Sequence, residues 1–304
     1  MQCIYVLMLS LLPAMLQAAS SEIIPSTLSE YRETSEDIKV AIQEKSRTAL
    51  KRDKYHPMLQ QGGPETLSLC AARLRENFPD GVFFCIGQSP AYIMACGRLE
   101  DELEKKDSDR WHHIIFSGKW VTRQDDGCYK QHRDGPTPKG LEFYRTYLTR
   151  HGMSPKHIIE RFEQGKKRTV IVDVCITGEG LYSFLEILSK WAEELHIAEQ
   201  MRNAMQIGIF QAKVYQEYVP PIDSLHDISA TKLPIASERE NEILKFFGSA
   251  DGFVDRLVPY YTWLRWDEWI EGLDPFPLGN NAKYVLFALI DHLMKKRSQP
   301  SKID

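Results

Sequence analysis

The amino-acid sequence predicts an α/β protein with a mainly parallel sheet and helices on both of its faces. Short, continuous apolar runs alternate with longer amphipathic stretches through the middle of the chain. Strands of a parallel sheet that is covered on both sides are apolar in this unbroken way, because both of their faces are buried. The chain has 304 residues, 43% hydrophobic and 26% charged, which is the composition of a folded protein with a sizeable core.

The predicted elements follow one another in a regular order. Four apolar runs are predicted as strands: Gly81–Ile86, His112–Phe116, Thr169–Cys175 and Gln206–Phe210. Helices are predicted at Glu65–Phe78, Pro90–Lys105, Lys139–Arg150, Pro155–Gln164 and Gly180–His196. Beyond Tyr215 the alternation stops, with a loop at Pro220–Pro234, helices at Ser237–Phe247 and Asn281–Lys296, and an aromatic core segment at Val258–Trp269 between them. We therefore predict a helical arm and linker over 20–63, an α/β core over 64–215 and a helical, aromatic-rich segment over 216–304.

The first residues form a separate unit. From Cys3 to Leu16 the chain reads CIYVLMLSLLPAML, and small residues follow at Ala18 and Ala19. This run is too short to span a bilayer as a helix but suits the core of a signal peptide. We predict a signal peptide over 1–19, a secreted or periplasmic protein, and no membrane span in the mature chain. No Lys or Arg precedes the run, so a buried N-terminal helix or a later start codon is the alternative.

Charge and cysteine usage exclude several classes of protein. The formal net charge is −4 and the pI is near 6.2, whereas nucleic-acid binding needs clustered cations to neutralise phosphates. The five cysteines beyond the predicted signal have no regular spacing, so they predict neither a disulfide framework nor a zinc site. The predicted partner is a small ligand and not a nucleic acid.

The first candidate site is the junction after the strand Gly81–Ile86. In an open α/β sheet, ligands bind beyond the carboxyl ends of the strands. Gly87 permits a tight turn, Ser89 suits a helix N-cap, and Pro90 suits the first helical position. We predict that Gly87, Gln88 and Ser89 present main-chain amides to a phosphate or carboxylate. An ordinary capped helix is an equal alternative.

The second candidate site is the junction after the strand Thr169–Cys175. Asp173 lies at the end of this buried strand, where a carboxylate must be solvated, paired or liganded. We predict Asp173 as the catalytic residue, receiving ribose hydroxyls or helping to hold a divalent ion such as Mg²⁺. The following Thr177, Gly178, Glu179 and Gly180 are predicted to surround a phosphate with main-chain amides and the threonine hydroxyl.

A long polar segment, Gly118–Gly135, separates the second and third predicted strands. Its length and its mixed charges predict an active-site flap or an exposed hairpin. Lys119 and Arg123 are the candidate cations for a phosphate, together with Arg133, and solvated surface cations are the alternative interpretation.

The segment Val170–Gly180 resembles the signature of the type I phosphoribosyltransferases. That signature is a hydrophobic strand, two acids, a short spacer and a Thr-Gly loop that holds the 5-phosphate of phosphoribosyl pyrophosphate. Asp173 matches the second acid and Thr177-Gly178 match the loop, while Ile86–Pro90 is similar in placement to the family's pyrophosphate loop.

The resemblance covers roughly Glu65–Phe210 and has two departures: Val172 stands in the place of the first acid, and Gly180 stands where the family often carries Thr or Ser. It implies a phosphoribosyltransferase-like fold, a phosphorylated ribose or nucleotide as ligand, and ribosyl or pyrophosphate transfer as the chemistry. Paired carboxylates would favour the developing positive charge of an oxocarbenium-like transition state. The alternative is a non-catalytic, secreted binding or effector protein that retains the fold and lacks the paired acids.

Overall fold

The computed structural model describes residues 27–51, 62–87, 90–116, 118–132, 134–212, 222–248 and 280–298. The predicted signal peptide, the aromatic segment Val258–Trp269, Gln88, Ser89 and Arg133 lie outside the described residues. Within those ranges, no helix combines the length and the apolar composition needed to cross a bilayer.

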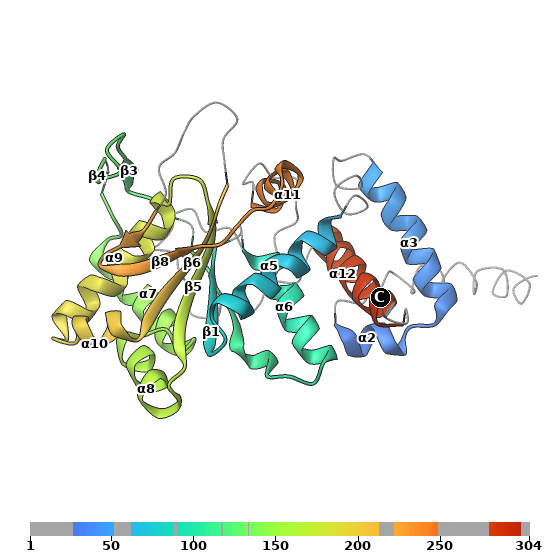
Figure 1. Cartoon of the computed structure of the whole chain (residues 1–304), viewed down its shortest axis with the longest axis horizontal. Coiled ribbons are helices and arrows are strands. Elements are labelled where there is room, and N and C mark those ends of the chain that lie inside the picture. The colour runs from blue at the N-terminus through green and yellow to red at the C-terminus, as the bar shows by residue number, and fades with distance from the viewer. Residues whose placement is uncertain are drawn as a thin grey trace, which may run out of the picture.

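A six-stranded sheet forms the centre of the protein (Figure 1). Its strands are β1 (Gly81–Ile86), β2 (Trp111–Ile114), β5 (Arg168–Cys175), β6 (Met205–Gln211), β7 (Ser224–Leu225) and β8 (Ile228–Lys232), in the order β2-β1-β5-β6-β8-β7. Every pair of neighbours is parallel except β7 with β8. The predicted α/β class is therefore confirmed, as a mixed sheet of mostly parallel strands with helices.

Both faces of the central strands are buried. In β5, Val170, Val172 and Val174 belong to one apolar core and Ile171 belongs to the other. All six residues of β1 are buried. This two-sided burial explains why the strands read as unbroken apolar runs in the sequence.

The helices divide between the two faces. One core includes side chains of α5 (Gly63–Asn77), α6 (Ala91–Leu103), α11 (Glu238–Gly248) and α12 (Asn280–Ser298). The other includes those of α7 (Pro138–Arg150), α8 (Pro155–Gly165), α9 (Glu179–Glu194) and α10 (Ala198–Asn203). Figure 1 shows the two sets on opposite sides of the sheet. Right-handed crossovers place helices on opposite faces when the chain changes direction along a sheet, as it does after β2.

Helices from the two ends of the described chain pack together beside α5 and α6 (Figure 1). They are α2 (Leu28–Glu33), α3 (Glu36–Lys51) and α12. The Tyr31 hydroxyl donates to Asp291 over 2.8 Å, and the Tyr31 ring lies 5.5 Å from that of Phe287. The α2 helix begins with a capping box between Thr27 and Glu30.

Three local predictions need correction. The predicted loop Pro220–Pro234 contains β7 and β8, and β8 extends the parallel sheet beyond residue 215. The short helix α10 is also missing from the prediction. Pro90 is the N-cap of α6, not its first helical residue. By contrast, the exposed hairpin predicted within Gly118–Gly135 is confirmed, as β3 (Val121–Arg123) paired with β4 (Tyr129–Gln131).

Candidate functional site

The strand order of the sheet reverses between β1 and β5. Numbered in chain order, the five parallel strands run 2-1-3-4-5, which is a common doubly wound arrangement. The connections after β1 and after β2 leave in opposite directions, and ligands of such sheets bind where this reversal opens a crevice. Because β1 and β5 are parallel neighbours, the Gly87 and Thr177 loops leave from the same edge of the sheet.

Asp173 lies on β5, one of the two strands at this reversal, opposite Ile209 of β6. Its neighbours Val172 and Val174 point into the core of α5 and α6, so Asp173 points toward the face that carries α7 and α9. The side chain is only partly exposed, and burial raises the pKa of its carboxyl to about 7, although the Val174 N–H lowers it in part. No cation in the described part of the chain forms an ion pair with it.

The loop after β5 takes its shape from Gly178. This residue has φ +76° and is the N-cap of α9. A Cβ at this position would lie 2.6 Å from Cδ1 of Ile222 and 2.8 Å from the Tyr129 hydroxyl oxygen, closer than side chains approach one another. The Tyr129 hydroxyl donates to the Thr177 carbonyl over 2.8 Å. The β3-β4 hairpin is thereby bonded to the predicted phosphate loop.

The first turn of α9 contains its own acid, Glu179, and leaves room beside Gly180. No side chain caps α9, because its N-cap residue is Gly178. The cap residue therefore offers no side-chain acceptor to the N–H groups of the first turn. A Cβ at Gly180 would lie 3.7 Å from the Gly118 carbonyl oxygen, which is ordinary contact. Glu179 is buried at the first helical position, where its negative charge interacts favourably with the positive end of the helix dipole.

Four of the predicted ligand-binding residues meet here, because Lys119, Arg123 and the Thr177 side chain all form hydrogen bonds with Glu179. The Lys119 ammonium lies 2.8 Å from Oε2 of Glu179, and the Arg123 N–H donates to Oε1 over 3.2 Å. Burial raises the pKa of Glu179, but the hydrogen bonds from Lys119 and Arg123 outweigh it and leave that pKa below its ordinary value. The Lys119 side chain remains 56% exposed. In this structure the Lys119 charge is thus balanced by Glu179.

The β1 junction holds a turn that requires glycine. Gly87 has φ +72°, and a Cβ there would lie 2.9 Å from the Phe116 carbonyl oxygen. Its N–H donates to the Ile114 carbonyl over 2.9 Å, and its own carbonyl lies 2.6 Å from Nε2 of His113. Burial lowers the pKa of His113 to about 4, so at neutral pH its ring is uncharged and Nε2–H can donate to that carbonyl.

Two residues of this edge are absent from the sequence predictions. Tyr129 carries the hydrogen bond to the Thr177 loop, and His113 holds the Gly87 turn. An alternating strand pattern around Tyr129 could have indicated that its ring faces inward, but the strand spans only three residues. Nothing in the sequence relates His113 to Gly87, because the pairing of β1 with β2 brings them together.

The residue predicted to help hold Mg²⁺ at this edge is Asp173. Among the described residues, no three His, Cys, Asp or Glu side chains come together in a group that could hold a metal. Mg²⁺ typically binds one or two carboxylates together with waters and ligand phosphates. Asp173 supplies a single carboxylate, so no step below depends on an ion held by the protein alone.

The buried thiols near the site are unsuited to nucleophilic catalysis. Burial raises the pKa of Cys175 well above its ordinary value, and the same cause raises the pKa of Cys85. A thiol of this kind stays protonated and behaves as a small apolar group. The five cysteines from Cys70 to Cys175 are free in this structure.

Comparisons with known proteins give no similarity to this chain: no family model, no curated protein and no solved structure matches.

Proposed function

We propose that this protein binds a phosphorylated ribose or a nucleotide at the edge of the sheet where β1 and β5 end. The observation that carries the proposal is the place of Asp173, a largely buried acid without an ionic partner among the described residues. It lies where the parallel sheet reverses its strand order, which is where doubly wound sheets bind ligands. Burying a carboxyl there is unfavourable unless something pairs with it.

Each neighbouring group has a role in this proposal. The Asp173 carboxylate accepts hydrogen bonds from ribose hydroxyls. The amides that begin α9, with the Thr177 hydroxyl, surround a phosphate, and the exposed Lys119 turns from Glu179 toward it. Any Mg²⁺ arrives with the ligand phosphates. The resemblance of Val170–Gly180 to type I phosphoribosyltransferases supports this assignment, and we propose a fold of that type.

A second candidate function is binding without catalysis. Val172 replaces the first acid of the phosphoribosyltransferase signature, and its side chain is fully buried in the core beneath α5 and α6. A single carboxylate stabilises an oxocarbenium-like transition state less than two do. A secreted binding or effector protein that retains the fold is therefore the alternative to a transferase.

Isothermal titration of the full chain with phosphoribosyl pyrophosphate, ribose 5-phosphate and AMP, each with Mg²⁺, tests the proposal. We expect saturable binding that Asp173→Asn weakens by about tenfold or more, since charge-assisted bonds contribute about 1.5–3 kcal/mol. Asp109→Asn is the matched control, because Asp109 is exposed and precedes β2 at the opposite edge of the sheet. Absence of binding to all three ligands would overturn the proposal. Release of pyrophosphate or free base over time separates a transferase from a binding protein.

Export is a separate proposal that rests on the apolar run Cys3–Leu16. N-terminal sequencing of the protein purified from its native source tests it. We expect a mature chain that begins near Ser20, and a mature chain that retains Met1 would contradict export.

A further inference from the structure

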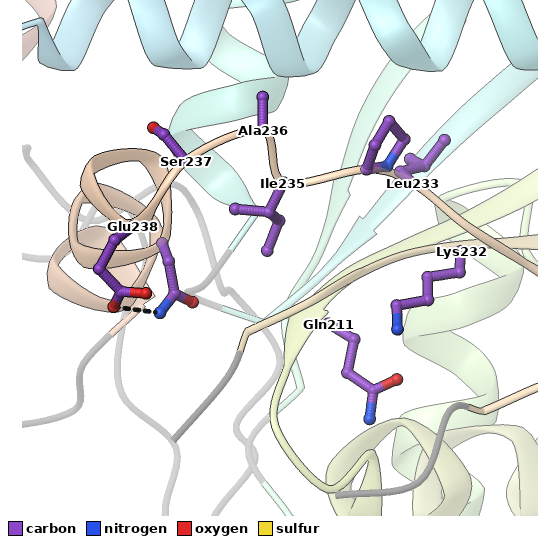
Figure 2. A pocket seen from close by; sticks show the side chains of 9 residues that line it. Gln211, Lys232, Leu233, Ile235, Ala236, Ser237 and Glu238 are labelled. Atoms are coloured by element: carbon purple, nitrogen blue, oxygen red, sulfur yellow. Dashed lines mark hydrogen bonds between the residues drawn. The ribbon is translucent and has the colours of Figure 1, made fainter. Parts of the chain in front are cut away.

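A cavity of about 350 Å³ lies where β6 and β8 end and α11 begins (Figure 2). Neither Asp173 nor the residues of the Gly87 and Thr177 loops line it. They are Gln211, Lys232, Leu233, Pro234, Ile235, Ala236, Ser237, Glu238 and Asn241. The volume is within the range of small-molecule sites.

The cavity combines apolar walls with two carboxamides. Leu233 and Ile235 supply apolar surface, and Figure 2 shows Ile235 pointing from its loop toward the side where Gln211 lies. Gln211 is 7% exposed and Asn241 is 3% exposed. Gln211 Nε2 donates to the Ile176 carbonyl over 3.3 Å, and Asn241 Nδ2 donates to Glu238 over 2.9 Å. These bonds orient both carboxamides at the cavity wall.

The charges around the cavity balance. Lys232 and Glu238 are both exposed and have opposite signs, and the other lining side chains are neutral. An anionic or cationic ligand would gain little net attraction here. A carboxamide presents a donor and an acceptor side by side, which suits a flat ring with the same alternation on its edge.

We propose that this cavity binds an uncharged, planar, hydrogen-bonding heterocycle of the nucleobase class. As the base subsite of a nucleotide, the inference rests on the proposed function. Gln211 ends β6, which pairs directly with β5, and its side chain bonds the carbonyl of Ile176, three residues after Asp173. Neighbouring strands lie about 4.8 Å apart, so two strand spacings, about 10 Å, join Asp173 to the cavity. A nucleoside spans such a distance.

Saturation-transfer NMR with adenosine, guanosine, cytidine and uridine, each offered to the full chain without phosphate, tests the cavity by itself. We expect at least one nucleoside to bind. Ala236→Trp, at an exposed lining position, should fill the cavity and weaken that binding by about tenfold or more. Gln211→Met should weaken it too, since it keeps the length of the unbranched side chain and removes the carboxamide. Lys156→Trp, exposed on α8 at the opposite edge of the sheet, is the control, with circular dichroism to verify folding.

The outcomes separate the two proposals. If no nucleoside binds, or if Ala236→Trp leaves nucleoside binding unchanged, the cavity proposal is overturned. If ribose 5-phosphate binds the wild type and Ala236→Trp equally well, the Asp173 site stands independently of that result. If nucleosides bind in the cavity but no phosphorylated ribose binds anywhere, the proposed function fails and the cavity assignment remains.

Discussion

Asp101 and Asp173 are both largely enclosed acids, yet their surroundings differ. Asp101 lies on α6 and is 1% exposed. Its carboxylate forms an ion pair with the Arg75 guanidinium over 2.9 Å and accepts a hydrogen bond from Nε1 of Trp111 over 2.6 Å. Asp173 has no cationic partner among the described residues, and burial raises its pKa to about 7. The first acid is compensated by the fold itself. For Asp173, the described residues do not compensate the free-energy cost of burying the carboxyl, and a bound ligand can lower that cost.

Glu240 follows the pattern of Asp101. It is buried at the start of α11, and its carboxylate accepts two hydrogen bonds from the Arg73 guanidinium, over 2.9 and 3.0 Å, and one from the Ala236 N–H. Burial raises the pKa of Glu240, but the bond from Arg73 more than reverses the effect. Asp101 and Glu240, two buried acids of the described residues, thus each have a guanidinium partner. Asp173 departs from that pattern at the edge where doubly wound sheets bind ligands, and this departure is the reason for proposing a site there.

The largest expected effect is on the structural side of this comparison. Asp101→Ala leaves the buried Trp111 N–H without its acceptor and removes one of the two carboxylates that pair with Arg75, which keeps Glu100. We expect the free energy of unfolding to fall by about 3 kcal/mol, because a buried donor loses its partner and the ion-pair network of Arg75 loses a member. Urea denaturation measures it, with Asp109→Ala on the exposed surface as the control. A loss below about 1 kcal/mol would show that the Asp101 pair contributes little.

Above neutral pH, Asp173→Asn should raise the free energy of unfolding, whereas Asp101→Ala should lower it. A raised pKa means that the folded state retains the proton, so its stability is fully present below the ordinary Asp pKa and falls as the pH rises through about 7. An asparagine at this position carries no charge, so the folded state has no buried carboxylate to ionise. We expect the variant to gain about 2 kcal/mol at pH above 7, with about 4 kcal/mol as an upper bound, and almost nothing near pH 4.

Denaturation of wild type and Asp173→Asn across this pH range checks the sign. A variant that is less stable than wild type above pH 7 would show that Asp173 has a stabilising partner, and the contrast with Asp101 would disappear.

Gly178→Ala should have an intermediate effect. The substitution forces a Cβ against Ile222 and Tyr129 at a positive φ. We expect a loss of about 1–3 kcal/mol in stability and weaker phosphate-ligand binding, since the Thr177 loop must shift. Gly180→Ala is the matched control, because its Cβ meets nothing closer than 3.7 Å. Equal stability of the two variants in thermal melts would refute the tight packing of this loop.

Lys119→Ala should have the smallest effect on stability. Its ion pair with Glu179 is largely exposed on the lysine side, and such pairs contribute about 0–1 kcal/mol. The proposed role in phosphate contact predicts a clear loss of affinity for ribose 5-phosphate alongside that small change in melting temperature. An unchanged affinity would leave Lys119 as a surface cation that serves only Glu179.

The buried strands were predictable because two-sided burial marks the sequence itself. Gly81–Ile86 is predicted with the boundaries that β1 has, and the order of elements places the Gly87 and Thr177 loops at one edge. The strand β8 was not predictable in this way. Its sequence, Ile228 to Lys232, is short and mostly polar, and only Ile228 is buried, so it lacks the apolar run of the inner strands.

The candidate site was predictable only in part. Asp173 and Gly178 are visible from sequence, because an acid on an apolar strand and a glycine before a helix are local signals. The bond of Tyr129 to the Thr177 loop and the cavity beside Gln211 arise from segments that are distant in the chain. The engagement of Lys119 with Glu179 joins residues 60 positions apart and has no local signal either.

The most direct test of the account is the pH dependence of ribose 5-phosphate binding, measured by titration calorimetry on either side of pH 7 for wild type and Asp173→Asn. If the Asp173 carboxylate accepts the ribose hydroxyls, wild type binds more tightly above its raised pKa, and the variant retains only the dependence of the phosphate itself. Affinities that are equal in the two proteins at both pH values would contradict the claim that Asp173 contacts the ligand.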